Sequence, residues 1–238
     1  MIEALAGAVA GAGLTALGLG MFHPRVALFG PQHSHGPRAA PRVALSFDDG
    51  PHPDFTPRIA EALAKTGAQA TFFCIGELAE KHPEVARALV AAGHELGNHT
   101  FSHNTGAHLF STAALTDDLR RCQALLATLG AAPRWYRPAV GIRNPPVHAA
   151  ARALGLQIVT WSGAARDGAW AFDEARALRL ARQAQAGDIL VLHDGLRGTP
   201  SRVRESTVRW LPTLLEALKV RGLQPVTVSQ LMAGPAQP

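Results

Sequence analysis

The sequence predicts an α/β protein built on a parallel sheet, arranged as an irregular (β/α)7-8 barrel. Short apolar segments alternate with helical segments from residue 42 onward, which is typical of parallel strands covered by helices. Glycines such as Gly67, Gly93 and Gly130 follow the helical segments, where a left-handed cap ends a helix. An open doubly wound sheet is the alternative arrangement of the same elements.

The elements follow one another in a regular order. Strands are expected at residues 43–47, 70–73, 95–97, 135–137, 157–161, 189–192 and 224–226. Helices are expected at residues 54–66, 83–92, 111–129, 145–154, 173–186 and 205–221. Pro83 and Asp173 stand at the first turn and at the N-cap of their helices, which supports those two starts.

Composition is typical of one globular domain. The 238 residues are 47% hydrophobic, enough to bury a core without disulfide bonds. Cys74 and Cys122 lack the CxxC spacing of a zinc site. The formal net charge is +5, but the basic residues are scattered and form no long run. Nucleic acid is therefore not expected as a partner.

An uncharged segment at residues 4–22 is long enough, as a helix, to cross a bilayer. The chain start carries Glu3 and no Lys or Arg, unlike a cleaved signal peptide. We therefore expect a membrane anchor or uncleaved signal-like helix over residues 1–22, a surface linker over 23–41 and a catalytic domain over 42–232. Basic residues after the anchor favour the cytoplasmic side, so the membrane face stays open.

Side chains suited to metal binding follow two of the expected strands. Asp48 and Asp49 end the first strand, where adjacent carboxylates repel each other unless a cation lies nearby. His99 and His103 follow the third strand, at a spacing that lets both bind one metal. With Asp49 they make the open three-ligand set of a hydrolytic zinc site. A solvated turn at residues 48–51 is the alternative.

Two further strand ends carry polar groups. Arg137 could pair with Asp48 and hold it ionised, and the turn at Val140 and Gly141 could direct a backbone N–H at a developing oxyanion. His193 directly follows a buried strand and is well placed as a general acid.

These segments, in this order, resemble the polysaccharide deacetylases, the NodB-homology domain of carbohydrate esterase family 4. The resemblance covers about residues 42 to 230 and rests on four motifs: SFDDGP at 46–51, HTFSH at 99–103, RPAVG at 137–141 and LVLH at 190–193. It implies the family's irregular barrel. It also implies that Asp48 is the catalytic base, that Asp49, His99 and His103 bind the metal, and that His193 is the catalytic acid.

The chain departs from the family pattern in two motifs. Ala139 and Val140 replace the usual proline and aromatic residue, so the third motif lacks the aromatic wall beside the sugar. In the fourth motif an alanine and a glycine, at 164 and 168, replace the usual Asp and Trp. Asp167 remains there as the expected partner of Arg137 or His193.

Together these features predict a metal-dependent hydrolase that removes N-acetyl groups from a cell-envelope polysaccharide or glycoconjugate. The expected cofactor is a divalent metal, zinc first and cobalt as the alternative. The expected partners are an N-acetylated glycan and, through the N-terminal helix, a membrane, with the catalytic domain on the periplasmic or extracellular side. Alternatives are an O-acetyl esterase or N-deformylase acting on a sugar, including a lipid-linked one, and a catalytically silent glycan-binding domain.

Overall fold

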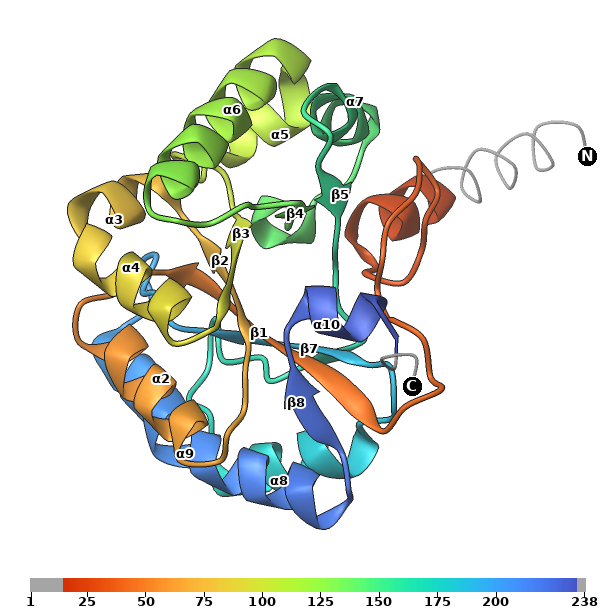
Figure 1. Ribbon diagram of the computed structural model, residues 1–238. Helices are drawn as coiled ribbons and strands as arrows, with labels where there is room; N and C mark the ends of the chain where they lie inside the picture. The colour runs from red at the N-terminus through yellow and green to blue at the C-terminus, as the bar shows by residue number, and fades with distance from the viewer. Residues whose placement is uncertain (1–14, 235–238) are drawn as a thin grey trace, which may run out of the picture.

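The computed structural model describes residues 15–234, and within them the strands form one parallel sheet (Figure 1). Their hydrogen-bonded order is β5-β4-β3-β2-β1-β7-β6, and β8 pairs with β1. The bounds are β1 (Arg42–Gly50), β2 (Thr71–Cys74), β3 (Glu95–Asn98), β4 (Trp135–Tyr136), β5 (Gln157–Ile158), β6 (Gly163–Ala164), β7 (Ile189–His193) and β8 (Gln224–Val226). The predicted parallel sheet is confirmed.

The sheet curls without closing. Its edge strands β5 and β6 are separated in the chain by residues 159–162 alone. Across this segment the backbone changes partner, because the Val159 N–H donates to the Tyr136 carbonyl and the Ser162 N–H donates to the Ile189 carbonyl. The predicted irregular barrel is therefore corrected to a half-barrel. Residues 159–162 thus hydrogen-bond first to β4 and then to β7, and within the described residues β5 and β6 are not paired with each other.

Helices cover the outer face of the curled sheet, and α3 and α4 lie between two larger groups (Figure 1). α2, α8 and α9 pack together on one side, and α5, α6 and α7 pack together on the other. The bounds are α2 (Phe55–Ala64), α3 (Gly76–Lys81), α4 (Pro83–Ala91), α5 (Thr105–Phe110), α6 (Thr112–Thr128), α7 (Pro145–Ala153), α8 (Glu174–Gln183), α9 (Ser201–Val220) and α10 (Val228–Met232), with a 3-10 turn η1 (Ala139–Gly141).

All six helices expected from the sequence are present, with ends shifted by a few residues. The elements that the sequence did not predict are α3, α5, η1, β6 and α10, and none is longer than six residues. Such short elements complete too few turns or alternations to leave a periodic signal.

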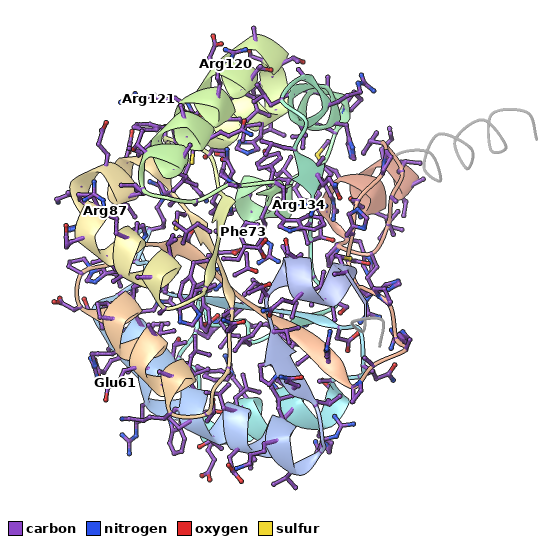
Figure 2. All side chains as sticks on the ribbon, in the orientation of Figure 1. Glu61, Phe73, Arg87, Arg120, Arg121 and Arg134 are labelled. Atoms are coloured by element: carbon purple, nitrogen blue, oxygen red, sulfur yellow. The ribbon has the colours of Figure 1, made fainter. Side chains whose placement is uncertain are left out.

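The two faces of the sheet bury different side chains. Phe47 and Phe72 are partners in register on β1 and β2, and their rings stack at 5.0 Å under the helices. Phe73 points to the inner face, as the alternation of a strand requires, and lies in the interior in Figure 2. Charged residues such as Arg87 and Arg120 project from the outer helices instead (Figure 2).

Residues 23–41, predicted as a surface linker, form an irregular segment that we call the strap. The His33 N–H donates to the Ile158 carbonyl, and the His33 carbonyl accepts from the Thr160 N–H. Further along, the Gly36 N–H donates to the Gly187 carbonyl. The strap thus pairs with the exposed edge at β5 and continues to the start of β7.

The expected membrane anchor at residues 1–22 lies largely outside the described residues. Residues 15–22 are helical, and their last turn contacts the domain through the Arg143 N–H, which donates to the Met21 carbonyl. None of the helices within residues 15–234 has the length and apolar character needed to cross a bilayer. The prediction of an apolar spanning helix is therefore not supported by the described part of the chain.

Candidate active site

The predicted site residues meet at the C-terminal ends of β1, β3, β4 and β7. The parallel register places Asp48 on β1 beside His193 on β7. It also places Asn98, the last residue of β3, beside Tyr136 on β4, so that His99 and Arg137 leave the sheet at the same level. Residues far apart in the sequence are therefore neighbours, because parallel strands end at one edge of a sheet.

Asp49, His99 and His103 form a candidate metal-binding cluster. One carboxylate oxygen of Asp49 lies 3.4 Å from the Nε2 atom of each histidine, and the three ligand atoms lie within 4.8 Å of one another. Asp49 and His103 have φ angles of 72° and 55°, which residues other than glycine seldom adopt. Two imidazole nitrogens and one carboxylate oxygen, held by a strained backbone, fit a divalent metal with open positions for water and substrate.

Hydrogen bonds and burial set the tautomer and the protonation of the two histidines as metal binding requires. The Nδ1 atom of His99 lies 2.7 Å from the Arg137 carbonyl, which can only accept, so Nδ1 donates and Nε2 faces Asp49. Burial lowers the pKa of His103 to about 3, so this imidazole is neutral at neutral pH. Burial also opposes protonation of His99, but the hydrogen bond and charge of Asp49 raise its pKa. A bound cation would take the place of that proton.

The loop that carries both histidines is held by α6. The carboxylate of Asp118 accepts hydrogen bonds from the backbone N–H groups of Phe101, at 2.9 Å, and Ser102, at 3.1 Å. The Thr100 hydroxyl accepts from the His103 N–H at 2.9 Å. The position of His103 therefore depends on a helix that contributes no metal ligand.

Asp48 is buried and paired with Arg137. The Nη1 atom of Arg137 donates to a carboxylate oxygen of Asp48 at 2.8 Å and to the Ser46 hydroxyl at 2.8 Å. Its Nη2 atom donates to the Thr160 carbonyl at 3.0 Å. The predicted ion pair is present, and Arg137 is fixed by β1 and by the segment that joins β5 to β6.

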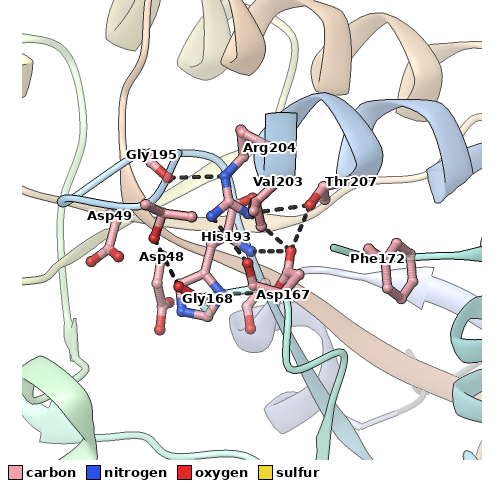
Figure 3. Close-up of polar contacts among 12 residues, drawn as sticks. Asp48, Asp49, Asp167, Gly168, Phe172, His193, Gly195, Val203, Arg204 and Thr207 are labelled. Atoms are coloured by element: carbon pink, nitrogen blue, oxygen red, sulfur yellow. Dashed lines mark hydrogen bonds and ion pairs between the residues drawn. The ribbon is translucent and has the colours of Figure 1, made fainter. Parts of the chain in front are cut away.

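His193 is held by Asp167, as Figure 3 shows. Its Nδ1 atom lies 2.9 Å from one Asp167 oxygen, while the other accepts from Arg204 at 3.0 Å and from the Thr207 hydroxyl at 2.9 Å. Burial opposes protonation of His193, but the charge and hydrogen bond of Asp167, with help from Asp48, raise its pKa to about 9. Two partners were expected for Asp167. In the structure Asp167 contacts His193 and not Arg137, which pairs with Asp48 instead.

One cleft, with a volume of about 640 Å³, is lined by Asp48, Asp49, His99, His103 and His193. Val140 and Gly141 line it, with φ angles of 48° and 71°. Trp161 and Trp170 also line it, and a Cβ atom on Gly141 would lie 2.6 Å from the Trp161 ring. Aromatic surface is therefore present in the cleft although the third motif lacks its usual aromatic residue.

Sequence reasoning missed the residues that support the site from α6 and α9. Asp118, Arg204 and Thr207 lie within helical segments and belong to no strand end. Arg204 is fully buried, although Arg is among the residues that are seldom buried unless they are paired. A single sequence carries no local signal that would distinguish these residues from other polar helix residues.

The fold and the site define the class of protein: a metal-dependent hydrolase on a curled parallel sheet, with a paired carboxylate and a paired histidine beside the metal position. The polysaccharide deacetylase family matches residues 35–159, slightly more than half of the chain. The chain therefore belongs to the polysaccharide deacetylase family, which confirms the resemblance, and it is a metal-dependent enzyme that removes N-acetyl groups from glycans.

Relatives of known identity agree with this assignment. The chain is 33% identical over 192 residues to a peptidoglycan-N-acetylglucosamine deacetylase of Bacillus cereus, covering 80% of this chain and 87% of the relative. It is 35% identical over 189 residues to a chitooligosaccharide deacetylase of Sinorhizobium fredii, covering 77% and 88%. A crystal structure of a peptidoglycan N-acetylglucosamine deacetylase in complex with a substituted N-oxidanyl-benzamide matches with a TM-score of 0.72 and 28% identity, covering 87% and 95%.

Proposed function

We propose that this protein is a zinc-dependent N-deacetylase of a cell-envelope glycan, with peptidoglycan as the first candidate substrate and chitooligosaccharides as the second. One observation carries the proposal. The cluster of Asp49, His99 and His103 shares a single cleft with a buried carboxylate, Asp48, and a histidine that holds a proton, His193. Amide hydrolysis needs all three kinds of group together.

Asp49, His99 and His103 would hold the metal. When bound, a divalent zinc ion lowers the pKa of a coordinated water, to about 7 in the best cases, and polarises a carbonyl oxygen. Two histidines and one carboxylate are a ligand set known from zinc hydrolases, and cobalt is the alternative metal.

Asp48 acts as the general base. Its carboxylate accepts a proton from the attacking water, so that oxygen adds to the acetyl carbonyl carbon. Arg137 donates to Asp48 from a fully buried position, which fixes the direction of the carboxylate. Arg137 is therefore a positioning residue rather than a group that touches substrate.

His193 acts as the general acid. It donates its proton to the amide nitrogen as the C–N bond breaks, which releases acetate and a free amine on the sugar. An amine leaves poorly without that proton, whereas an ester alcohol needs it less. The buried contact with Asp167, which raises the pKa of His193, therefore favours an N-acetyl over an O-acetyl substrate.

We assign the stabilisation of the negative charge that develops on the acetyl oxygen to the backbone N–H of Val140, next to Gly141. Both residues line the cleft, and their positive φ angles are typical of a backbone held for function. Val140 is 64% exposed, so the loss of the usual aromatic residue leaves this wall of the cleft open.

Because envelope glycans lie outside the cytoplasm, we infer that the catalytic domain works on the periplasmic or extracellular side. A fusion of the full chain to a reporter that is active on only one side of the membrane tests this. Reporter activity confined to the cytoplasm would contradict it.

Acetate release tests the proposed reaction. Soluble protein starting at residue 15 would be stripped of metal, refilled with zinc or cobalt, and incubated with peptidoglycan fragments and chitooligosaccharides. Metal-dependent acetate from either substrate supports the proposal and ranks the two glycans. Formate or ester products in place of acetate would favour the deformylase or esterase alternative. A chain that binds no metal would favour the silent glycan-binding domain.

A further inference from the structure

A second cavity, of about 820 Å³, adjoins the catalytic cleft. Both are lined by Trp161, Ala164 and Arg166, so they meet where the chain crosses from β5 to β6. From there the second cavity extends between the strap and α8. A glycan chain bound in the catalytic cleft could therefore continue into it.

The second cavity is strongly basic. Arg25 from the strap, Arg166 after β6 and Arg179 from α8 line it, and none of the three has an ion-pair partner within residues 15–234. The lining includes one carboxylate, Asp188, and it is already paired with Arg38 at 3.6 Å. The cavity therefore holds positive charge that the described chain does not neutralise.

The backbone holds one of these arginines in place and is strained at a second. The Nη2 atom of Arg25 donates to the Ser162 carbonyl at 2.5 Å, which leaves the other N–H groups of its guanidinium available. Arg166 has a φ angle of 60°, a strained conformation that clusters at ligand sites. Between the two cavities stands Ala164, which contributes no charge where the family pattern has an acidic residue.

We propose that this cavity, the arginine pocket, binds an anionic group of the glycan, on a sugar next to the one that is deacetylated. The group is an oxyanion, a carboxylate or a phosphate, because a guanidinium forms paired hydrogen bonds with either. The inference rests on the proposed function, since it requires a glycan in the catalytic cleft. It makes the protein selective for acidic over neutral N-acetylated glycans.

The test compares substrates that differ in the anionic group they carry, and the free acid and methyl ester of one substrate isolate the effect of charge. The neutral probe is chitotetraose. The carboxylate probe is a tetrasaccharide of alternating N-acetylglucosamine and N-acetylmuramic acid, tested as the free acid and as its methyl ester. The phosphate probe is chitotetraose 1-phosphate. The zinc-loaded protein starting at residue 15 is assayed for acetate release, and its affinity for each probe is measured separately by calorimetry.

The test variant is Arg25→Gln combined with Arg179→Gln, and the matched control is Arg182→Gln. Arg182 lies on the same helix as Arg179 and is also exposed, but it lines a different groove. For the double variant we expect the ratio of kcat/KM for the acidic probe to that for chitotetraose to fall about tenfold, through KM. Two solvent-accessible charge contacts have about that combined effect. The control should keep the wild-type ratio.

The outcomes separate the two proposals. The bound group is a carboxylate if the double variant lowers the kcat/KM ratio for the free acid but not for the methyl ester. It is a phosphate if the double variant lowers the ratio for the 1-phosphate alone. Equal ratios in wild type and double variant, with chitotetraose still deacetylated, overturn the arginine pocket and leave the deacetylase intact. If no probe is deacetylated, the calorimetric affinities decide: tighter binding of an acidic probe that the double variant loses supports the pocket, and its absence overturns it.

Discussion

Asp48 and Asp49 are adjacent residues with opposite surroundings. Asp48 ends the regular part of β1 and pairs with Arg137, while Asp49 turns out of the strand with a φ angle of 72° to face His99 and His103. Adjacent residues of a strand point to opposite sides, so the two carboxylates are expected to diverge. In the structure, the left-handed turn at Asp49 adds to that alternation.

This division of roles predicts different effects of two isosteric changes. Asp49→Asn should lose both bound metal and activity, because a neutral amide is a poor metal ligand. Asp48→Asn should keep its metal but lose about 10²- to 10⁴-fold in kcat, the usual effect of removing a general base. Elemental analysis of the purified proteins and acetate release measure the two properties. Full zinc content in Asp49→Asn would contradict the assignment of the ligands.

The pair of His193 and Asp167 predicts the pH dependence of the reaction. His193 must be protonated to donate, so kcat should fall as the pH rises through its pKa of about 9. Asp167→Asn removes the charge that raises this pKa, so the alkaline fall should move to lower pH. The profile of kcat against pH for wild type and variant measures the shift.

Thr207→Val is the control for that experiment. It removes a hydrogen bond to Asp167 at 2.9 Å but keeps the contact between Asp167 and His193, so its alkaline limb should shift less. Asp167→Asn also leaves the buried Arg204 without its carboxylate, a change that costs about 3–5 kcal/mol of stability. An alkaline limb that is the same in Asp167→Asn and in wild type would contradict the role of Asp167.

At the level of elements, α6 fixes the position of the loop that carries His99 and His103. Asp118→Ala removes the acceptor for the N–H groups of Phe101 and Ser102. We expect zinc affinity to fall 10- to 100-fold, as for other partners that orient metal ligands, while the fold is retained. Competition with a chelator measures the affinity, and circular dichroism checks the fold.

The matched control is Asp117→Ala, on the same helix. Asp117 is exposed and pairs with Arg120 on the helix surface, so its loss should leave zinc affinity unchanged. Equal affinities in the two variants would show that the loop does not depend on α6.

At the scale of the whole molecule, the strap covers an edge of an incompletely closed sheet. A chain starting at residue 42 loses the hydrogen bonds of His33 and Gly36 to the sheet. Three such bonds contribute about 1 kcal/mol each, so the melting temperature should fall by roughly 6–12 °C relative to a chain starting at residue 15. A chain starting at residue 23 keeps the strap and is the control. Thermal unfolding followed by circular dichroism measures the difference, and equal melting temperatures for the chains starting at 23 and 42 would contradict it.

Predictions from sequence succeeded where one local pattern decides the structure. The long helices α6 and α9 and the strands β1 and β7 were located by their apolar periodicity. Asp48, Asp49 and His193 could be placed because a parallel sheet brings the ends of its strands to one edge. Short elements such as α3 and α10 were missed because they span fewer than two helical turns.

The sequence by itself determined the parallel α/β class, the deacetylase motifs and the three candidate metal ligands, because strand and helix periodicity and short motifs are recorded in residues close in the chain. Tertiary structure alone decided that the sheet stays a half-barrel, that Asp167 serves His193, and that Arg25, Arg166 and Arg179 surround one cavity. These features join residues far apart in the chain, and their contacts depend on packing that no local pattern records.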